Sequence, residues 1–211
     1  RQDLHRLAVN PLLLTVMTLV HTYKGQLPDA RAELYQEVVD MLLWRWEAVK
    51  IDSYDGSQTD MLRLMKQAGI REIDLKQEIW KLAFEAHGEM RDSDTAERTA
   101  DIDEISLLRA LRALHPDNDL AWAEQMVQII KLRTGLLPER LPEVYTFPHR
   151  TFQEYLSACH LSIQPKFVDM IFGMSTHMTY WREVILLAIG RLVQLGSGLD
   201  KPLGLVGKLC P

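Results

Sequence analysis

The sequence predicts a mainly α-helical protein that contains one short β-hairpin. Along most of the 211 residues, apolar side chains recur at the spacing of a helical face, as at Phe152, Tyr155 and Leu156. Strict alternation is confined to short stretches such as residues 144–147, which is too little strand for a large sheet. The regular alternation of strands and helices that a parallel sheet requires is not found. The length allows one or two domains with a sizeable core.

Two helices are expected at the start of the chain. Asn10 offers an N-cap and Pro11 suits the first helical position, so a helix should begin at Pro11 and run to about residue 23. Residues 24–28 contain glycine and proline and should break it. The next helix is expected over residues 29–49. Its apolar surface is wide, which indicates burial on two sides.

The middle of the chain predicts four helices followed by a hairpin. The helices are expected at residues 61–69, 75–87, 105–115 and 119–134. Residues 91–104 are acidic and polar, which predicts a solvated loop. Leu136 and Leu137 are expected in one strand and residues 144–147 in the other. The last three of these helices, followed by the hairpin, have the element order of a winged helix.

The stretch from Phe147 to Leu156 joins the second strand to the next helix. Thr151 and Glu154 have the spacing of a capping box, so this helix is expected to begin near Phe152 with Thr151 as its N-cap. His149 and Arg150 would then stand just before the helix, beside unpaired N–H groups and the positive end of its dipole. This combination suits a phosphate. The residues alone also allow His149 to be a packed loop histidine at a strand–helix junction.

The end of the chain predicts a short helix near residues 167–171, a longer one over 181–195, and a glycine-rich tail. The tail contains Gly207-Lys208, but Leu209 follows where a phosphate-binding loop needs serine or threonine. Neither this loop nor an acidic pair for magnesium occurs in the sequence, so no catalytic residue is expected. The histidines are scattered, so no metal site is expected either.

Charge, cysteine content and the length of the apolar stretches argue against several classes of function. The net charge is −5, and residues 92–148 carry 11 acidic and 6 basic residues. The candidate recognition helix, residues 119–134, has only Lys131 and Arg133 as cations, which argues against DNA binding. Cys159 and Cys210 are too few for a disulfide scaffold, so a reducing cytoplasm is expected. The apolar stretch of residues 12–20 is much shorter than the roughly 20 residues that a membrane span needs, so no membrane association is expected.

Three stretches together resemble the NACHT-type signalling ATPases, which belong to the STAND class of NTPases. F-P-H-R-T-F-Q-E-Y-L at residues 147–156 is similar to the signature near the end of that family's winged-helix domain. N-P-L-L-L at residues 10–14 is similar to a segment of its small helical domain, after the ATPase core. G-Q-L-P at residues 25–28, with R-A-E-L-Y at 31–35, is similar to the start of the next helix. The stretches occur in family order and cover roughly residues 4–163.

The resemblance implies a mainly α architecture in three parts. Residues 1–28 would be the end of the small helical domain, which acts as a lid. Residues 29–165 would be a winged-helix domain with one β-hairpin, and residues 166–211 the start of a further helical domain. The chain would then be part of a larger protein, whose ATPase core would lie upstream.

The resemblance also implies a function. The whole protein would be an ATPase that uses ATP or ADP as a switch, with magnesium held by upstream residues; this part alone would bind neither and would be inactive. His149 would reach the ADP phosphates and Pro11 the adenine, whereas Arg150 would matter less. The partner would be the protein's own NACHT ATPase core, and ATP would permit assembly of a homo-oligomer.

Two other function classes stay open on the sequence. A winged helix is also found in DNA-binding regulators, although the acidic balance argues against that role here. A helical protein-interaction module without a nucleotide role is the second. In that case the exposed parts of the five tryptophans would form the binding surface, but burial in a core explains them as well.

Overall fold

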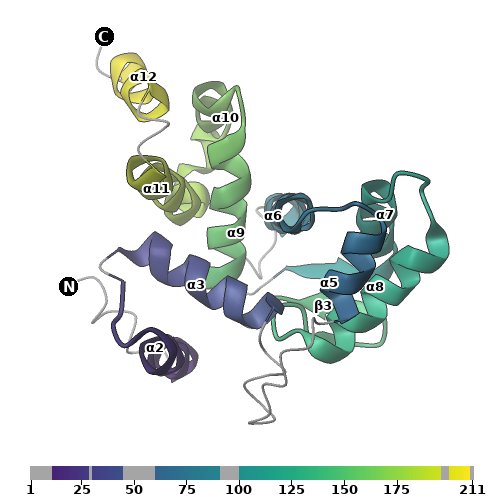
Figure 1. Cartoon of the computed structure of the whole chain (residues 1–211). Coiled ribbons are helices and arrows are strands. Elements are labelled where there is room, and N and C mark those ends of the chain that lie inside the picture. Colours follow the sequence, from purple (N-terminus) through teal and green to yellow (C-terminus); the bar gives the residue numbers. More distant parts are fainter. Residues whose placement is uncertain (1–10, 29, 45–59, 91–99, 196–199, 210–211) are drawn as a thin grey trace.

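The fold is mainly α-helical with one small sheet, as predicted (Figure 1). The computed structural model describes residues 11–28, 30–44, 60–90, 100–195 and 200–209. The first helices are α2 (Pro11–Lys24), α3 (Arg31–Trp44), α5 (Asp60–Gln67) and α6 (Glu72–Glu89). Next come β1 (Asp101–Asp103), α7 (Glu104–Leu114), α8 (Leu120–Arg133), β2 (Glu139–Leu141) and β3 (Val144–Thr146). The last elements are α9 (Arg150–Ile163), α10 (Phe167–Gly173), the 3₁₀ turn η2 (Ser175–His177), α11 (Met178–Leu195) and α12 (Asp200–Leu209).

The sheet has three antiparallel strands in the order β1-β3-β2. The prediction of a solvated loop over residues 91–104 is wrong at its end, because residues 101–103 form β1; residues 91–99 lie outside the described part of the chain. Ile102 explains the strand, since it is buried and pairs with Tyr145 of β3. A single apolar residue among acidic neighbours gives no periodicity, so only its partner strand reveals it.

The first strand of the hairpin was predicted three residues too early. It is β2 (Glu139–Leu141), whereas Leu136 and Leu137 precede it and are both fully buried. Neighbouring residues of a strand point to opposite faces, so two adjacent buried leucines do not fit a strand at the edge of a sheet. The hairpin turns at Glu143, which has a positive φ of 62°.

The order α6-β1-α7-α8-β2-β3 is that of a winged helix, with a strand between the first two helices and a hairpin at the end. Aspartates cap the second and third helices of this unit. Asp103 accepts from the Ser106 N–H at 2.8 Å, and Asp119 accepts from the Trp122 N–H at 3.2 Å. The Trp122 indole then donates to the Leu64 carbonyl oxygen at 3.2 Å, which attaches α8 to α5.

Helix α9 is the centre of the molecule and packs against α6 on one side and α11 on the other. Figure 1 shows α3 crossing near one end of α9, with α5, α7 and α8 grouped on the far side of α6. Most residues of α3 are buried: Ala32, Leu34, Tyr35, Val38, Val39, Met41, Leu42 and Leu43. The predicted burial of this helix on two sides is therefore confirmed, although residues 45–49 of its predicted range lie outside the described part.

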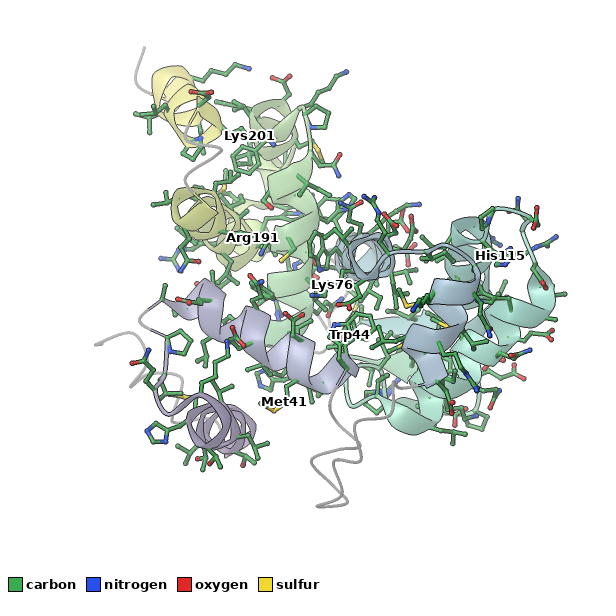
Figure 2. The ribbon with its side chains drawn as sticks, in the orientation of Figure 1. Met41, Trp44, Lys76, His115, Arg191 and Lys201 are labelled. Carbon is green, nitrogen blue, oxygen red and sulfur yellow. The ribbon has the colours of Figure 1, made fainter. Side chains whose placement is uncertain are left out.

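Polar contacts fix α3 on its neighbours. Lys76 of α6 pairs with Asp40 at 2.6 Å and lies 6.0 Å from the ring centre of Trp44. Figure 2 shows Trp44 and Lys76 where α3 meets α6. Arg191 of α11 reaches Gln36 at 3.4 Å. These contacts make α3 part of the same packed body as the winged helix.

The C-terminal glycine-rich tail contains a helix. No element was predicted for this tail, and residues 200–209 form α12. Lys201 donates to the Ser162 carbonyl oxygen at 2.7 Å, and Lys208 pairs with Asp169 at 2.6 Å, so tertiary contacts offset the low helix propensity of glycine. The predicted separate domain at residues 166–211 stays a prediction, as do the bounds 1–28 and 29–165.

Two negative findings apply to the described residues. No helix among them is long and apolar enough to cross a membrane. They also contain no group of three or more histidine, cysteine or acidic side chains placed to hold a metal ion. Cys159 is a buried free thiol, and burial raises its pKa to about 11.

Candidate functional site

The candidate site is the start of α9, where the winged-helix hairpin ends. His149 is the N-cap of this helix, and its Nδ1 accepts a hydrogen bond from the Thr151 N–H at 3.2 Å. The helix therefore begins at Arg150, and the predicted start near Phe152 is wrong. The predicted capping box is wrong as well, because the Glu154 carboxylate instead accepts from Nε of Arg150 at 2.8 Å. A histidine ring can replace a hydroxyl as the acceptor at a cap, and here the ring stands two residues ahead of Thr151.

This geometry changes how the helix start could bind an anion. The Thr151 N–H donates to His149, and the Phe152 N–H donates to the His149 carbonyl oxygen at 3.0 Å. The expectation of unpaired N–H groups beside His149 is therefore wrong for these two groups. A phosphate at this point would depend more on side-chain donors than on the backbone.

The cap also decides where the proton of His149 lies. Because Nδ1 accepts from the Thr151 N–H, the neutral ring must carry its proton on Nε2. The Thr151 hydroxyl lies 3.0 Å from the same Nδ1 and can donate to it too. Burial lowers the pKa of His149, which favours the neutral ring near pH 7. The site thus presents an Nε2–H donor on a partly buried, oriented ring.

Arg150 is held by groups on two helices. Its Nε donates to Glu154, and its guanidinium lies 5.3 Å from the ring centre of Tyr180 on α11. Glu154 is buried, and this burial raises its pKa, while Arg150 acts in the opposite direction. Through these contacts, Arg150 joins α9 to α11.

Pro11 is the first residue of α2, the position predicted for it. Its side chain is outside the described part of the structure. Helix α2 packs against α3, and α3 packs against α9, so Pro11 and His149 belong to elements that α3 connects.

Sequence reasoning missed three residues near this site. Arg31 and Tyr35 come from α3, and Glu183 comes from α11. Arg31 pairs with Glu183 at 3.6 Å, and the Tyr35 ring meets Phe152 edge-on at 6.0 Å. Both α3 residues lie in the R-A-E-L-Y stretch, which the sequence marked only as the start of a helix. Nothing local in the sequence indicates that this stretch meets residues 149–154.

Most tryptophans belong to the core. Trp80, Trp122 and Trp181 are buried, and Trp44 is partly buried against the core. Trp46 lies outside the described residues. The tryptophans described here therefore do not supply the exposed surface on which the interaction-module reading depended.

A family model described as "Winged helix-turn-helix domain C-terminal to NACHT" matches residues 31–161. The chain belongs to this family. Comparison with curated proteins and with solved structures gives no significant match.

In this NACHT-associated winged helix, α8 stands where a DNA-binding relative would place its recognition helix. Glu124, Gln125 and Gln128 are exposed on it. Among the side chains described on α8, the one cation is Lys131, and it pairs with Glu139 of β2 at 2.7 Å. The described side chains of α8 therefore offer no unpaired cation for the phosphate contacts that DNA binding needs.

Proposed function

We propose that this NACHT-associated winged helix is the nucleotide-sensing, autoinhibitory part of an ATP/ADP switch protein in signal transduction. In this proposal the domain closes over its own NACHT core, and His149 donates a hydrogen bond from Nε2 to a phosphate of ADP. Pro11 lies against the adenine, and Arg150 contributes less because Glu154 and Tyr180 hold it. Magnesium and the catalytic groups come from the core, so this chain alone binds no nucleotide and hydrolyses none.

The observation that supports the proposal best is the hydrogen bond from the Thr151 N–H to Nδ1 of His149. It fixes both the orientation of the ring and the position of its proton, so that Nε2 can only donate. A donor that is oriented before the ligand binds loses little conformational freedom on binding. A hydrogen bond to a charged phosphate is worth about 1.5–3 kcal/mol.

The switch follows from the difference between two states. A ligand shifts an equilibrium only by its differential affinity for the two forms. If His149 touches ADP only when the domain is closed, ADP favours the closed form by the value of that contact. ATP would release the domain and permit the protein to form a homo-oligomer in the cytoplasm.

The experiment uses the protein that contains the NACHT core, with ADP as the probe. His149→Asn keeps a good N-cap residue but withdraws the ring, whereas His149→Ala removes both. Both variants should bind ADP about 10- to 100-fold more weakly, and both should oligomerise without stimulus. Unchanged ADP affinity and a monomeric resting state in His149→Asn would show that His149 is only a packed cap residue.

A further inference from the structure

Two polar groups of α3 are buried beside the first turn of α9. Tyr35 is 0 % exposed, and its ring packs edge-on against Phe152 and stacks on Tyr155 at 5.5 Å. Within the described part of the chain, the Tyr35 hydroxyl makes no well-aligned hydrogen bond, and neither does the buried Nε of Arg31. Buried polar groups are almost always paired, so two unpaired groups this close together call for an explanation.

The two groups continue a run of polar atoms that begins at the cap of α9. The Thr151 hydroxyl lies 3.0 Å from Nδ1 of His149. Burial raises the pKa of Tyr35, whereas hydrogen-bonding contacts with the Arg31 guanidinium and the Thr151 hydroxyl act against that rise. Both groups therefore lie within reach of the Tyr35 hydroxyl, although neither forms a well-aligned hydrogen bond with it. His149, Thr151, Tyr35 and Arg31 extend from the start of α9 to the start of α3.

Arg31 has a second neighbour, Glu183 on α11. The guanidinium Nη2 lies 3.6 Å from the carboxylate Oε2, and each side chain is 35 % exposed. This separation is longer than a good charge-assisted hydrogen bond, and partial exposure weakens the pair further. Glu183 also accepts from Arg182 at 3.0 Å, and Arg150 and Glu154 are bonded to each other at 2.8 Å. A phosphate offers a guanidinium a better partner than this distant carboxylate, because it can accept two parallel N–H bonds.

We propose that Arg31 and Tyr35 complete a phosphate site with His149, and that a bound phosphate removes Arg31 from Glu183. The inference rests on the proposed function, because His149 provides the first contact with ADP. It adds an effect on α11, since the Arg31–Glu183 pair joins α3 to the N-terminal half of that helix. Nucleotide binding and this helix contact then exclude each other, so α11 loses its contact with Arg31 when the site is occupied.

The binding test measures ADP affinity in the protein that contains the NACHT core. Arg31→Gln should weaken ADP binding about tenfold. Glu183→Gln should strengthen it about two- to fivefold, because the competing carboxylate charge is gone. Tyr35→Phe removes only the hydroxyl and should weaken binding severalfold, while the free protein melts no lower than the wild type.

Two matched controls accompany these variants. Tyr155→Phe removes a hydroxyl from the ring stacked on Tyr35, but this hydroxyl contacts Arg191 at 3.3 Å and should not affect ADP affinity. Asp169→Asn breaks the ion pair with Lys208 between α10 and α12 and should be neutral as well.

A second measurement follows α11 directly. On addition of ADP, amide hydrogen exchange in residues 178–186 should become faster in the wild type and stay constant in Arg31→Gln. Unchanged ADP affinity in Arg31→Gln, Glu183→Gln and Tyr35→Phe, with weaker binding in His149→Asn, would overturn this inference and leave the proposed function intact. Weaker binding in Arg31→Gln and Tyr35→Phe with wild-type binding in His149→Asn would instead overturn the proposed role of His149. Wild-type binding in all four variants overturns both.

Discussion

The Tyr180 hydroxyl donates a hydrogen bond to the carbonyl oxygen of His87 at 2.8 Å, and the rings of the two residues stack 4.4 Å apart. This contact joins α11 to α6 across 93 positions of sequence. Trp181 also helps to enclose the imidazole, because the two rings meet edge-on with their centres 4.9 Å apart. His87 is 1 % exposed, and burial lowers its pKa to about 4.

The buried His87 predicts a loss of stability in mild acid. The unfolded chain takes up a proton near pH 6.5, whereas the folded chain resists until about pH 4. Full stability is therefore present above pH 6.5 and is lost as the pH falls towards 4, by about 3 kcal/mol at most. Urea unfolding between pH 7 and 4.5 measures this loss. His87→Phe keeps the stacked ring and should show a flatter dependence; an equally steep one would exclude His87 as the cause.

The cap of α9 predicts different stabilities for two substitutions at His149. His149→Ala removes the acceptor for the Thr151 N–H and should lower the free energy of unfolding by about 1 kcal/mol. His149→Asn supplies a side-chain oxygen at the same position and should stay within about 0.5 kcal/mol of the wild type. Urea denaturation of the 211-residue chain provides the comparison. Equal losses in both variants would mean that packing of the ring, rather than the cap, stabilises the helix start.

The Arg150–Glu154 pair predicts strong coupling between two neighbouring residues of α9. Glu154 is buried, so Arg150→Ala leaves a buried carboxylate without its guanidinium. Each single variant should lose more than half of the stability that the double variant loses. The coupling energy should be about 1 kcal/mol. Thr151 and Glu154 should be additive, since Glu154 bonds to Arg150. Coupling between Thr151 and Glu154 in a double-mutant cycle would instead support the capping box.

The winged helix predicts no specific binding to duplex DNA. Lys131 of α8 is paired with Glu139, and the helix exposes Glu124 and two glutamines. Without phosphate contacts, neither the affinity nor its salt dependence can be large. Titration with duplex DNA at 50 mM salt should give no binding at protein concentrations of about 1 μM. Sub-micromolar affinity that falls steeply with added salt would favour a DNA-binding regulator.

The sequence by itself determined most of the helices and the class of fold. Their apolar spacing and their caps act within one or two helical turns, so they can be recognised without knowing the neighbours. Pro11 at the start of α2 is an example. The stretch of residues 147–156 also indicated the family, and the match over residues 31–161 confirms it.

Tertiary structure decided what depends on distant partners. Strand β1 exists because Ile102 pairs with Tyr145, and α12 is helical where Lys201 and Lys208 find acceptors on α9 and α10. At the candidate site, both His149 and Thr151 could cap α9, and local spacing favoured Thr151. The fold instead places Thr151 near the buried Tyr35 of α3 and leaves the cap to His149. Burial between helices that lie far apart in sequence therefore decides which residue caps α9. A local stretch of sequence does not contain this information.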